Sequence, residues 1–134
     1  MLFRSTKPKN EIWKVGIEDP TDATNTICSV ELTDASIVTS GSYQRYFEHN
    51  GTRYHHIIDP DTLYPENVYL SVSVMCSSSA LSDALSTALF NMSYDEGIEL
   101  VSGMDNVDVI WVYPDINNDY TIKYTDGFSK CFED

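Results

Sequence analysis

The sequence predicts an α+β domain in which two central helices pack on a mainly antiparallel sheet. Short runs rich in β-branched residues alternate with turn-forming residues over most of the chain. Two consecutive segments in the middle, residues 80–91 and 94–102, have apolar side chains at helical spacing instead. The chain has 134 residues, of which 42% are hydrophobic, so we expect residues 1–134 to form a single domain with a sizeable core.

In the first part of the chain the pattern predicts strands at residues 11–18, 26–32 and 36–39. The first of them alternates apolar and polar side chains. Asp19 and Pro20 end it, because a proline cannot donate to a strand ladder.

A β-hairpin is the clearest local signal. Residues 43–48 and 53–58 flank Asn50 and Gly51, which supply the positive φ angles that a type I′ turn requires. Residues 39–41, Thr-Ser-Gly, precede this hairpin. We interpret them either as a simple turn or as a place where the backbone approaches a ligand closely.

The second part of the chain contains the predicted helices between further strands. Residues 67–76 read as a long strand, with one face formed by Val68, Leu70, Val72 and Val74, and the other by Tyr69, Ser71 and Ser73. Serines 77–79 offer N-caps for the first helix, whose apolar stripe comprises Leu81, Leu85, Leu89 and Met92. Gly103 is expected to end the second helix, and strands are expected at residues 107–113 and 120–124.

The amino-acid composition narrows the classes of molecule that the chain is expected to bind. Eight Lys and Arg stand against 21 Asp and Glu, a formal net charge of −13, which argues against nucleic-acid binding and suits a cation. No apolar stretch approaches the length of a transmembrane helix, and the first ten residues lack the apolar region of a signal peptide. The three cysteines predict no disulfide framework or zinc site, although a single disulfide among them remains open.

Two groups of residues have the chemistry for a site. His55 and His56 are adjacent on a predicted strand, so they point to opposite faces and one of them can face a pocket. Asp83 and Thr87 are four apart on one helix face, with Ser86 bordering it; their hard oxygen atoms suit Mg²⁺. Ordinary strand polarity and a solvated helix face are the alternatives.

In their order along the chain, these segments resemble one family. TSGSYQRYFEHNGTRYHHIIDPDTLYP at residues 39–65 and SDALSTALFNM at residues 82–92 resemble the C-terminal half of the FAD:protein FMN transferases, the ApbE-type flavin transferases. EIWKVGIEDP at residues 11–20 is similar to the W-x-V-G-I-x-D-P strand of that family. The resemblance extends over residues 11–132.

The resemblance implies an Mg²⁺-dependent enzyme that cleaves FAD, transfers FMN to a Thr or Ser hydroxyl of an acceptor protein, and releases AMP. It implies that Asp83 and Thr87 bind the metal, with Ser86 as a further ligand in some members. His56 and Ile57 match the motif beside the flavin nucleotide, and His56 is the candidate that assists proton removal from the acceptor hydroxyl.

Two features depart from the family pattern. The family has Thr-Gly-Tyr-Pro where this chain has Leu63 after Thr62. Because leucine does not freely adopt positive φ, we expect a different turn here, shaped by Asp59. Family members are also about twice as long, so this chain corresponds to their C-terminal half, with the N-terminal half absent.

An incomplete sheet predicts an exposed edge and self-association, and we expect little or no transferase activity from the chain alone. Two other functions remain open, a non-catalytic flavin- or metal-binding remnant and an acidic interaction module. The sequence does not determine the compartment; the family's members are typically exported, membrane-anchored lipoproteins.

Overall fold

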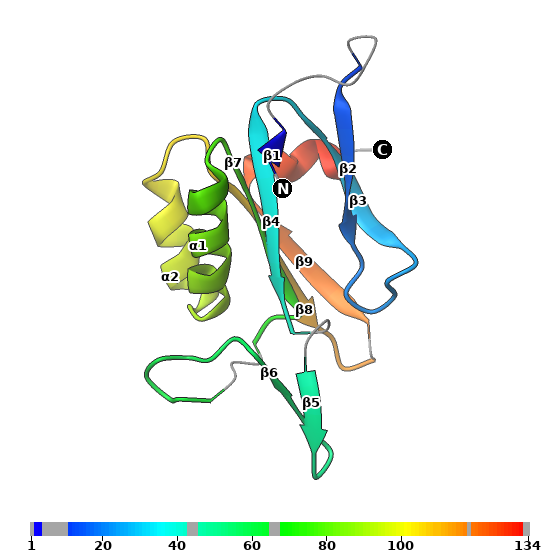
Figure 1. The fold of residues 1–134 in the computed structure, drawn as a ribbon, viewed down its shortest axis with the longest axis vertical. Helices are drawn as coiled ribbons and strands as arrows, with labels where there is room; N and C mark the ends of the chain where they lie inside the picture. The colour runs from blue at the N-terminus through cyan, green and yellow to red at the C-terminus, as the bar shows by residue number, and fades with distance from the viewer. Residues whose placement is uncertain (1, 4–10, 43–45, 65–67, 118, 133–134) are drawn as a thin grey trace.

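The computed structural model describes residues 2–3, 11–42, 46–64, 68–117 and 119–132, which fold into three layers (Figure 1). The middle layer is a five-stranded antiparallel sheet. Helices α1 (Ser79–Phe90) and α2 (Tyr94–Ser102) lie on one face of it. On the other face lie the strand pair β2 (Trp13–Glu18) and β3 (Thr26–Leu32), and the 3-10 helix η2 (Asp126–Cys131). The predicted α+β class is therefore confirmed.

The sheet has the strand order β1-β4-β7-β8-β9. Its strands are β1 (Leu2–Phe3), β4 (Ala35–Gly41), β7 (Ser71–Cys76), β8 (Asp108–Pro114) and β9 (Tyr120–Tyr124). β1 pairs only with Ala35 and Ser36. Among the described residues, no strand lies against residues 38–41 on that side of β4, and the expected self-association at this edge stays a prediction.

Two apolar cores lie on the two faces of the sheet. On the helix side, Leu85 and Leu89 of α1 pack on Val72, Val74 and Trp111, and all but Leu85 are fully buried. On the other side, the second core joins the β2–β3 pair and η2 to the sheet through Val30, Leu32, Ile110, Val112 and Phe128. Because both faces are covered, the central strands β7 and β8 are buried on both sides.

Helix ends follow the predicted capping signals. Ser78 is the N-cap of α1, and its side chain accepts a hydrogen bond from the Leu81 N–H. Ser93 and Glu96 form a reciprocal capping box at the start of α2, and Gly103 is the C-cap. No helix among the described parts of the chain has the length and apolar character needed to cross a lipid bilayer.

A separate hairpin extends from the lower end of the molecule in Figure 1. It comprises β5 (Tyr46–His49) and β6 (Thr52–His55), shorter than the predicted strands. Asn50 and Gly51 have φ values of 51° and 76°, so the predicted I′-type backbone at this turn is confirmed.

Three predictions about local structure are wrong. Residues 39–41 are not a turn but the end of β4. β7 begins only at Ser71, and before it Tyr69 packs in the helix-side core while Leu70 packs in the second core, the reverse of the predicted faces. The buried face of α1 includes Ser82 and Ser86 and not Leu81, which is 36% exposed. Small serine side chains let α1 approach β4 closely. β1 and η2 were not predicted.

Candidate functional site

The candidate metal-binding face lies on α1. Asp83 and Thr87 are both exposed and one helical turn apart, as predicted. The Thr87 hydroxyl donates to the Asp83 carbonyl oxygen at 3.4 Å. A carboxylate and a hydroxyl thus face solvent from the same side of the helix.

Ser86, the third predicted metal residue, is placed differently. It is fully buried, and its Oγ lies 2.8 Å from Ser40 Oγ at the end of β4 and donates to the Asp83 carbonyl at 3.0 Å. Ser40 Oγ also lies 3.5 Å from Thr87 Oγ1. Ser40 belongs to residues 39–41, for which the sequence predicted a simple turn or a close backbone approach to a ligand; a role for its hydroxyl was not predicted. Its 46-residue separation from Ser86 leaves no sequence signal for the pairing.

This donor set fits Mg²⁺ as a partial site. All its atoms are oxygens, which Mg²⁺ prefers, and two of the side chains are open to solvent. Among the residues that the structure describes, no three His, Cys, Asp or Glu side chains come together as a metal site. The ion would therefore keep several waters or take phosphate oxygens from a substrate, which is how Mg²⁺ is commonly bound.

The two histidines at the end of the hairpin differ in exposure. His55 is 4% exposed, and its ring meets the Phe90 ring edge-on at 5.4 Å between centroids. Its Nδ1 accepts a hydrogen bond from the Ile57 N–H at 3.3 Å. His56, the predicted catalytic residue, is exposed. Ile57 is buried in the helix-side core, so any contact it makes with a ligand has to come from its main chain.

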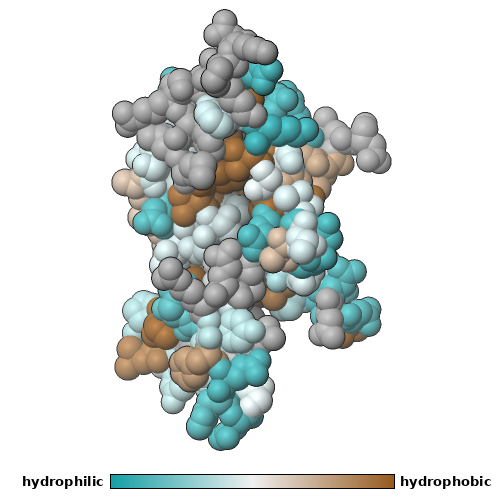
Figure 2. Space-filling model, turned by 45° about the vertical axis from the view of Figure 1, so that its right-hand side comes forward, coloured by the Kyte–Doolittle hydropathy of each residue, from teal (hydrophilic) through white to brown (hydrophobic). Residues whose placement is uncertain are grey.

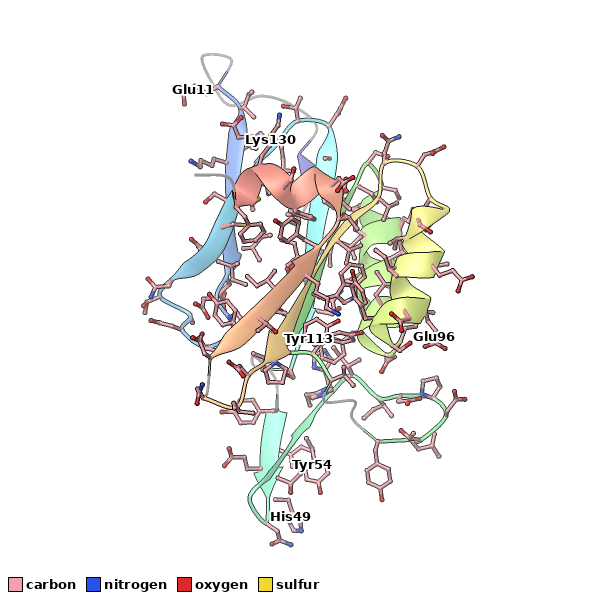
Figure 3. The ribbon with its side chains drawn as sticks, turned by 180° about the vertical axis from the view of Figure 1, so that it is seen from behind. Glu11, His49, Tyr54, Glu96, Tyr113 and Lys130 are labelled. Atoms are coloured by element: carbon pink, nitrogen blue, oxygen red, sulfur yellow. The ribbon has the colours of Figure 1, made fainter. Side chains whose placement is uncertain are left out.

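An aromatic hollow of about 350 Å³ lies on the hairpin. Its lining is Tyr46, Phe47, Tyr54, His55 and His56. The Phe47 and Tyr54 rings stack with centroids 5.2 Å apart, and Phe47 is 64% exposed. Figure 2 shows hydrophobic side chains gathered at this lower end, and Figure 3 shows Tyr54 on the hairpin beneath Tyr113 of β8. A flat aromatic ligand suits such a surface.

The loop after the hairpin is organised by Asp59, as predicted. Its carboxylate accepts hydrogen bonds from the main-chain N–H groups of Asp61 and Thr62. Leu63 has a φ of 60°, so this leucine adopts the left-handed conformation that glycine adopts more easily. The expectation that leucine avoids positive φ here is wrong. The hydrogen bonds around Asp59, including one from the Leu63 N–H to its carbonyl, hold the turn in place.

The predicted site residues form two groups. Hydrogen bonds join Asp83, Ser86 and Thr87 to one another and to β4. His56 lines the aromatic hollow at the hairpin instead. The His55–Phe90 contact links the two groups, because Phe90 ends the helix that carries Asp83 and Thr87.

Comparison with known proteins assigns the chain to a protein family. Residues 1–111 match the family model described as the ApbE family. The chain belongs to the ApbE family. The FAD:protein FMN transferase of Treponema pallidum (strain Nichols) is 40% identical over 114 residues, which cover 84% of this chain and 32% of that protein. The FAD:protein FMN transferase of Rhodobacter capsulatus is 45% identical over 78 residues, covering 58% of this chain and 15% of that protein.

Solved ApbE structures have the same fold. The ApbE protein of Thermotoga maritima MSB8 matches with a TM-score of 0.81 and 28% identity, over 97% of this chain and 41% of that one. The flavinyl transferase ApbE of Pseudomonas stutzeri, in its apo form, matches with a TM-score of 0.73 and 30% identity, over 96% of this chain and 39% of that one. The chain spans about a third of the length of the first curated relatives it matches.

Proposed function

We propose that this chain carries part of the active site of an FAD:protein FMN transferase, corresponding to the C-terminal part of the family fold. The observation that carries the proposal is the family match over residues 1–111, whose relatives bear that enzyme name. The exposed oxygens of Asp83 and Thr87 and the aromatic hollow beside His56 supply chemistry that such a reaction needs.

In the proposed reaction, a Thr or Ser hydroxyl oxygen of an acceptor protein bonds to the FMN phosphorus of FAD. The bond from that phosphorus to the bridging oxygen breaks, and AMP leaves. The hydroxyl proton goes to the His56 imidazole, which is exposed and can return it to solvent. The aromatic hollow orients the flavin ring system against the hairpin.

Asp83 and Thr87 would hold Mg²⁺, with Ser86 and Ser40 positioning that part of α1 and β4. When bound, the ion offsets the negative charge that develops on the phosphate oxygens. A chain with a net charge of −13 repels an anionic dinucleotide at long range, so FAD binding should depend strongly on the divalent cation.

Ligand binding tests the first half of the proposal. FAD with Mg²⁺, at 100 times the dissociation constant, should stabilise the folded chain by about 2.7 kcal/mol in thermal unfolding. Asp83→Ala should remove the Mg²⁺-dependent part of that gain. Asp105→Ala, which changes an exposed carboxylate after α2, is the matched control and should retain it. A gain unaffected by Asp83→Ala would contradict the metal assignment.

An assay of FMN transfer to an acceptor peptide tests the second half of the proposal. The chain is joined behind the N-terminal part of the Treponema pallidum relative and incubated with FAD, Mg²⁺ and a threonine-containing acceptor peptide. We expect FMN on the peptide by mass spectrometry, with His56→Ala slowing transfer roughly 10²–10⁴-fold at saturating FAD. His49→Ala, also exposed on the hairpin, should have little effect. FAD binding without any transfer would identify a non-catalytic flavin-binding module instead.

A further inference from the structure

Two of the three cysteines, from distant parts of the chain, meet in the second core. Cys28 on β3 is buried, and Cys131, at the end of η2, is partly buried against the same core. The Cys131 thiol lies near enough to Cys28 to contribute to the raised pKa of the Cys28 thiol, after burial, which is the larger cause. The Cys131 thiol also lies 3.7 Å from the carbonyl oxygen of Ser29, the neighbour of Cys28. Both cysteines are free thiols in this structure.

Cys131 is reachable from solvent. It lines a hollow of about 750 Å³ between the β2–β3 pair and η2, together with Ser29, Lys14 and Lys130. In Figure 3, η2 crosses the upper part of the molecule, with Lys130 labelled beside it. A small-molecule disulfide can therefore approach Cys131, whereas Cys28 lies behind it in the core with 8% of its surface exposed.

The third cysteine makes a natural comparison. Cys76, on β7, is buried in the helix-side core, across the sheet from the other two. Its thiol donates to the Ser78 carbonyl oxygen at 3.1 Å and lies 3.0 Å from Ser82 Oγ. Cys76 thus has its hydroxyl and carbonyl partners on the helix side of the sheet, away from Cys28 and Cys131.

We propose that Cys28 and Cys131 form a redox modification site, at which a low-molecular-weight disulfide such as glutathione disulfide oxidises them to an intramolecular disulfide. Cys131 packs against the core that contains Cys28, and its thiol lies 3.7 Å from the carbonyl oxygen of Ser29, the residue after Cys28, so we expect the bond to need little main-chain movement. The site is independent of the proposed flavin chemistry, because it lies on the face of the sheet opposite α1.

The reaction takes place as two exchanges. Cys131 loses its proton to water and attacks glutathione disulfide, which forms a mixed disulfide and releases one glutathione thiolate. Cys28 then gives up its proton and attacks the Cys131 sulfur, and the second glutathione leaves as a thiol. Two protein thiols are oxidised and one glutathione disulfide is reduced to two thiols.

The environments of the two thiols decide which of them attacks glutathione disulfide first. Burial, together with the Cys131 thiol beside it, raises the pKa of Cys28 to about 12, so Cys28 is protonated at neutral pH. The thiolate is the attacking form, which makes Cys28 the poorer first nucleophile. Cys131, at the wall of the hollow, is the thiol that meets the oxidant first.

Disulfide mapping on the full chain tests this inference. The chain is incubated with excess glutathione disulfide, quenched in acid, unfolded and alkylated, and its peptides are analysed by mass spectrometry. We expect a cross-linked pair of peptides containing Cys28 and Cys131, formed at a rate independent of protein concentration, with Cys76 alkylated. Glutathione remaining on Cys131, or a cross-link through Cys76, would overturn the proposal.

Stability and variants give a second measurement. The oxidised chain should melt roughly 5–15 °C higher than the reduced chain, because the bond closes a long loop in the unfolded ensemble. Cys28→Ser and Cys131→Ser should each abolish that increase, whereas Cys76→Ser should retain it. An oxidised wild-type chain that melts no higher than the reduced one would contradict a preformed pair, whether or not the variants fold.

Discussion

At the scale of single residues, the turn at Leu63 has an unfavourable backbone conformation. Leu63 has a φ of 60° and is 73% exposed, so no burial of its side chain offsets the cost of that conformation. Asp34, Asn50 and Asn106 also have positive φ, but Asn and Asp tolerate it better.

Replacing Leu63 with glycine should therefore stabilise the fold by up to about 1 kcal/mol, the relief of backbone strain less the greater entropy of the unfolded glycine. Urea unfolding measures the difference. Leu63→Ala is the matched control, because it removes the exposed side chain and keeps the Cβ that causes the strain. An equal gain from both variants would assign the effect to the side chain.

At Gly127, by contrast, we expect a substitution to destabilise the fold. A Cβ there would overlap the Asp108 carboxyl group, which accepts hydrogen bonds from the Gly127 N–H and the Thr125 hydroxyl. Gly127→Ala should cost roughly 1–3 kcal/mol in the free energy of unfolding, since the carboxylate must move away from its donors. Gly103→Ala has room for its Cβ and should be close to neutral in the same thermal or urea unfolding experiment.

At the scale of elements, α2 depends on its capping box. Hydrogen bonds from the Ser93 hydroxyl and main-chain N–H lower the pKa of Glu96. A carboxyl whose pKa is lowered on folding contributes stability that is present above its unfolded pKa, here near 4.5, and is lost as pH falls through the folded value.

Ser93→Ala should cost about 1 kcal/mol at pH 7, and the difference from the wild type should narrow as the pH falls below 4.5. Urea unfolding over a pH series measures it. Ser102→Ala, at the other end of the helix, removes a hydroxyl that bonds only the Glu99 carbonyl and should show no such pH dependence. A difference that stays constant with pH would show that the Glu96 half of the box contributes nothing.

At the scale of the whole molecule, the 134 residues have two cores on the two faces of one sheet, which should suffice for cooperative folding. The proposed reaction needs more, because the chain spans about a third of its curated relatives. We therefore predict a single thermal unfolding transition for the chain expressed by itself, and no transfer of FMN to an acceptor peptide with FAD and Mg²⁺. Flavinylated peptide in that assay would contradict the division of the active site.

How far the sequence predicts the structure differs between elements. β3, α2 and β9 have the predicted bounds, because each is marked by local patterns and end signals. The short 3-10 helix η2 was missed, since its one buried side chain, Phe128, shows no periodicity. The predicted faces are wrong for Tyr69 and Leu70, which precede β7, because the alternation rule holds only within a regular strand.

In the candidate site, too, local sequence patterns predicted some features and tertiary packing decided the others. Strand alternation predicted opposite faces for His55 and His56, but β6 ends at His55, and only the packing of the hairpin against Phe90 decided that His55 is the buried one. Helical spacing placed Asp83 and Thr87 together on an exposed face. The burial of Ser86 depends on Ser40, which is far away in the sequence.

The sequence by itself determined the class of fold, the helix ends, the hairpin turn and the family, because each depends on residue types at short spacing. Only the tertiary structure decided which serines support α1, which histidine faces solvent, and that Cys131 packs against the core that contains Cys28. These contacts join segments that are distant in the chain. No local pattern encodes them, since they arise only when the two layers close over the sheet.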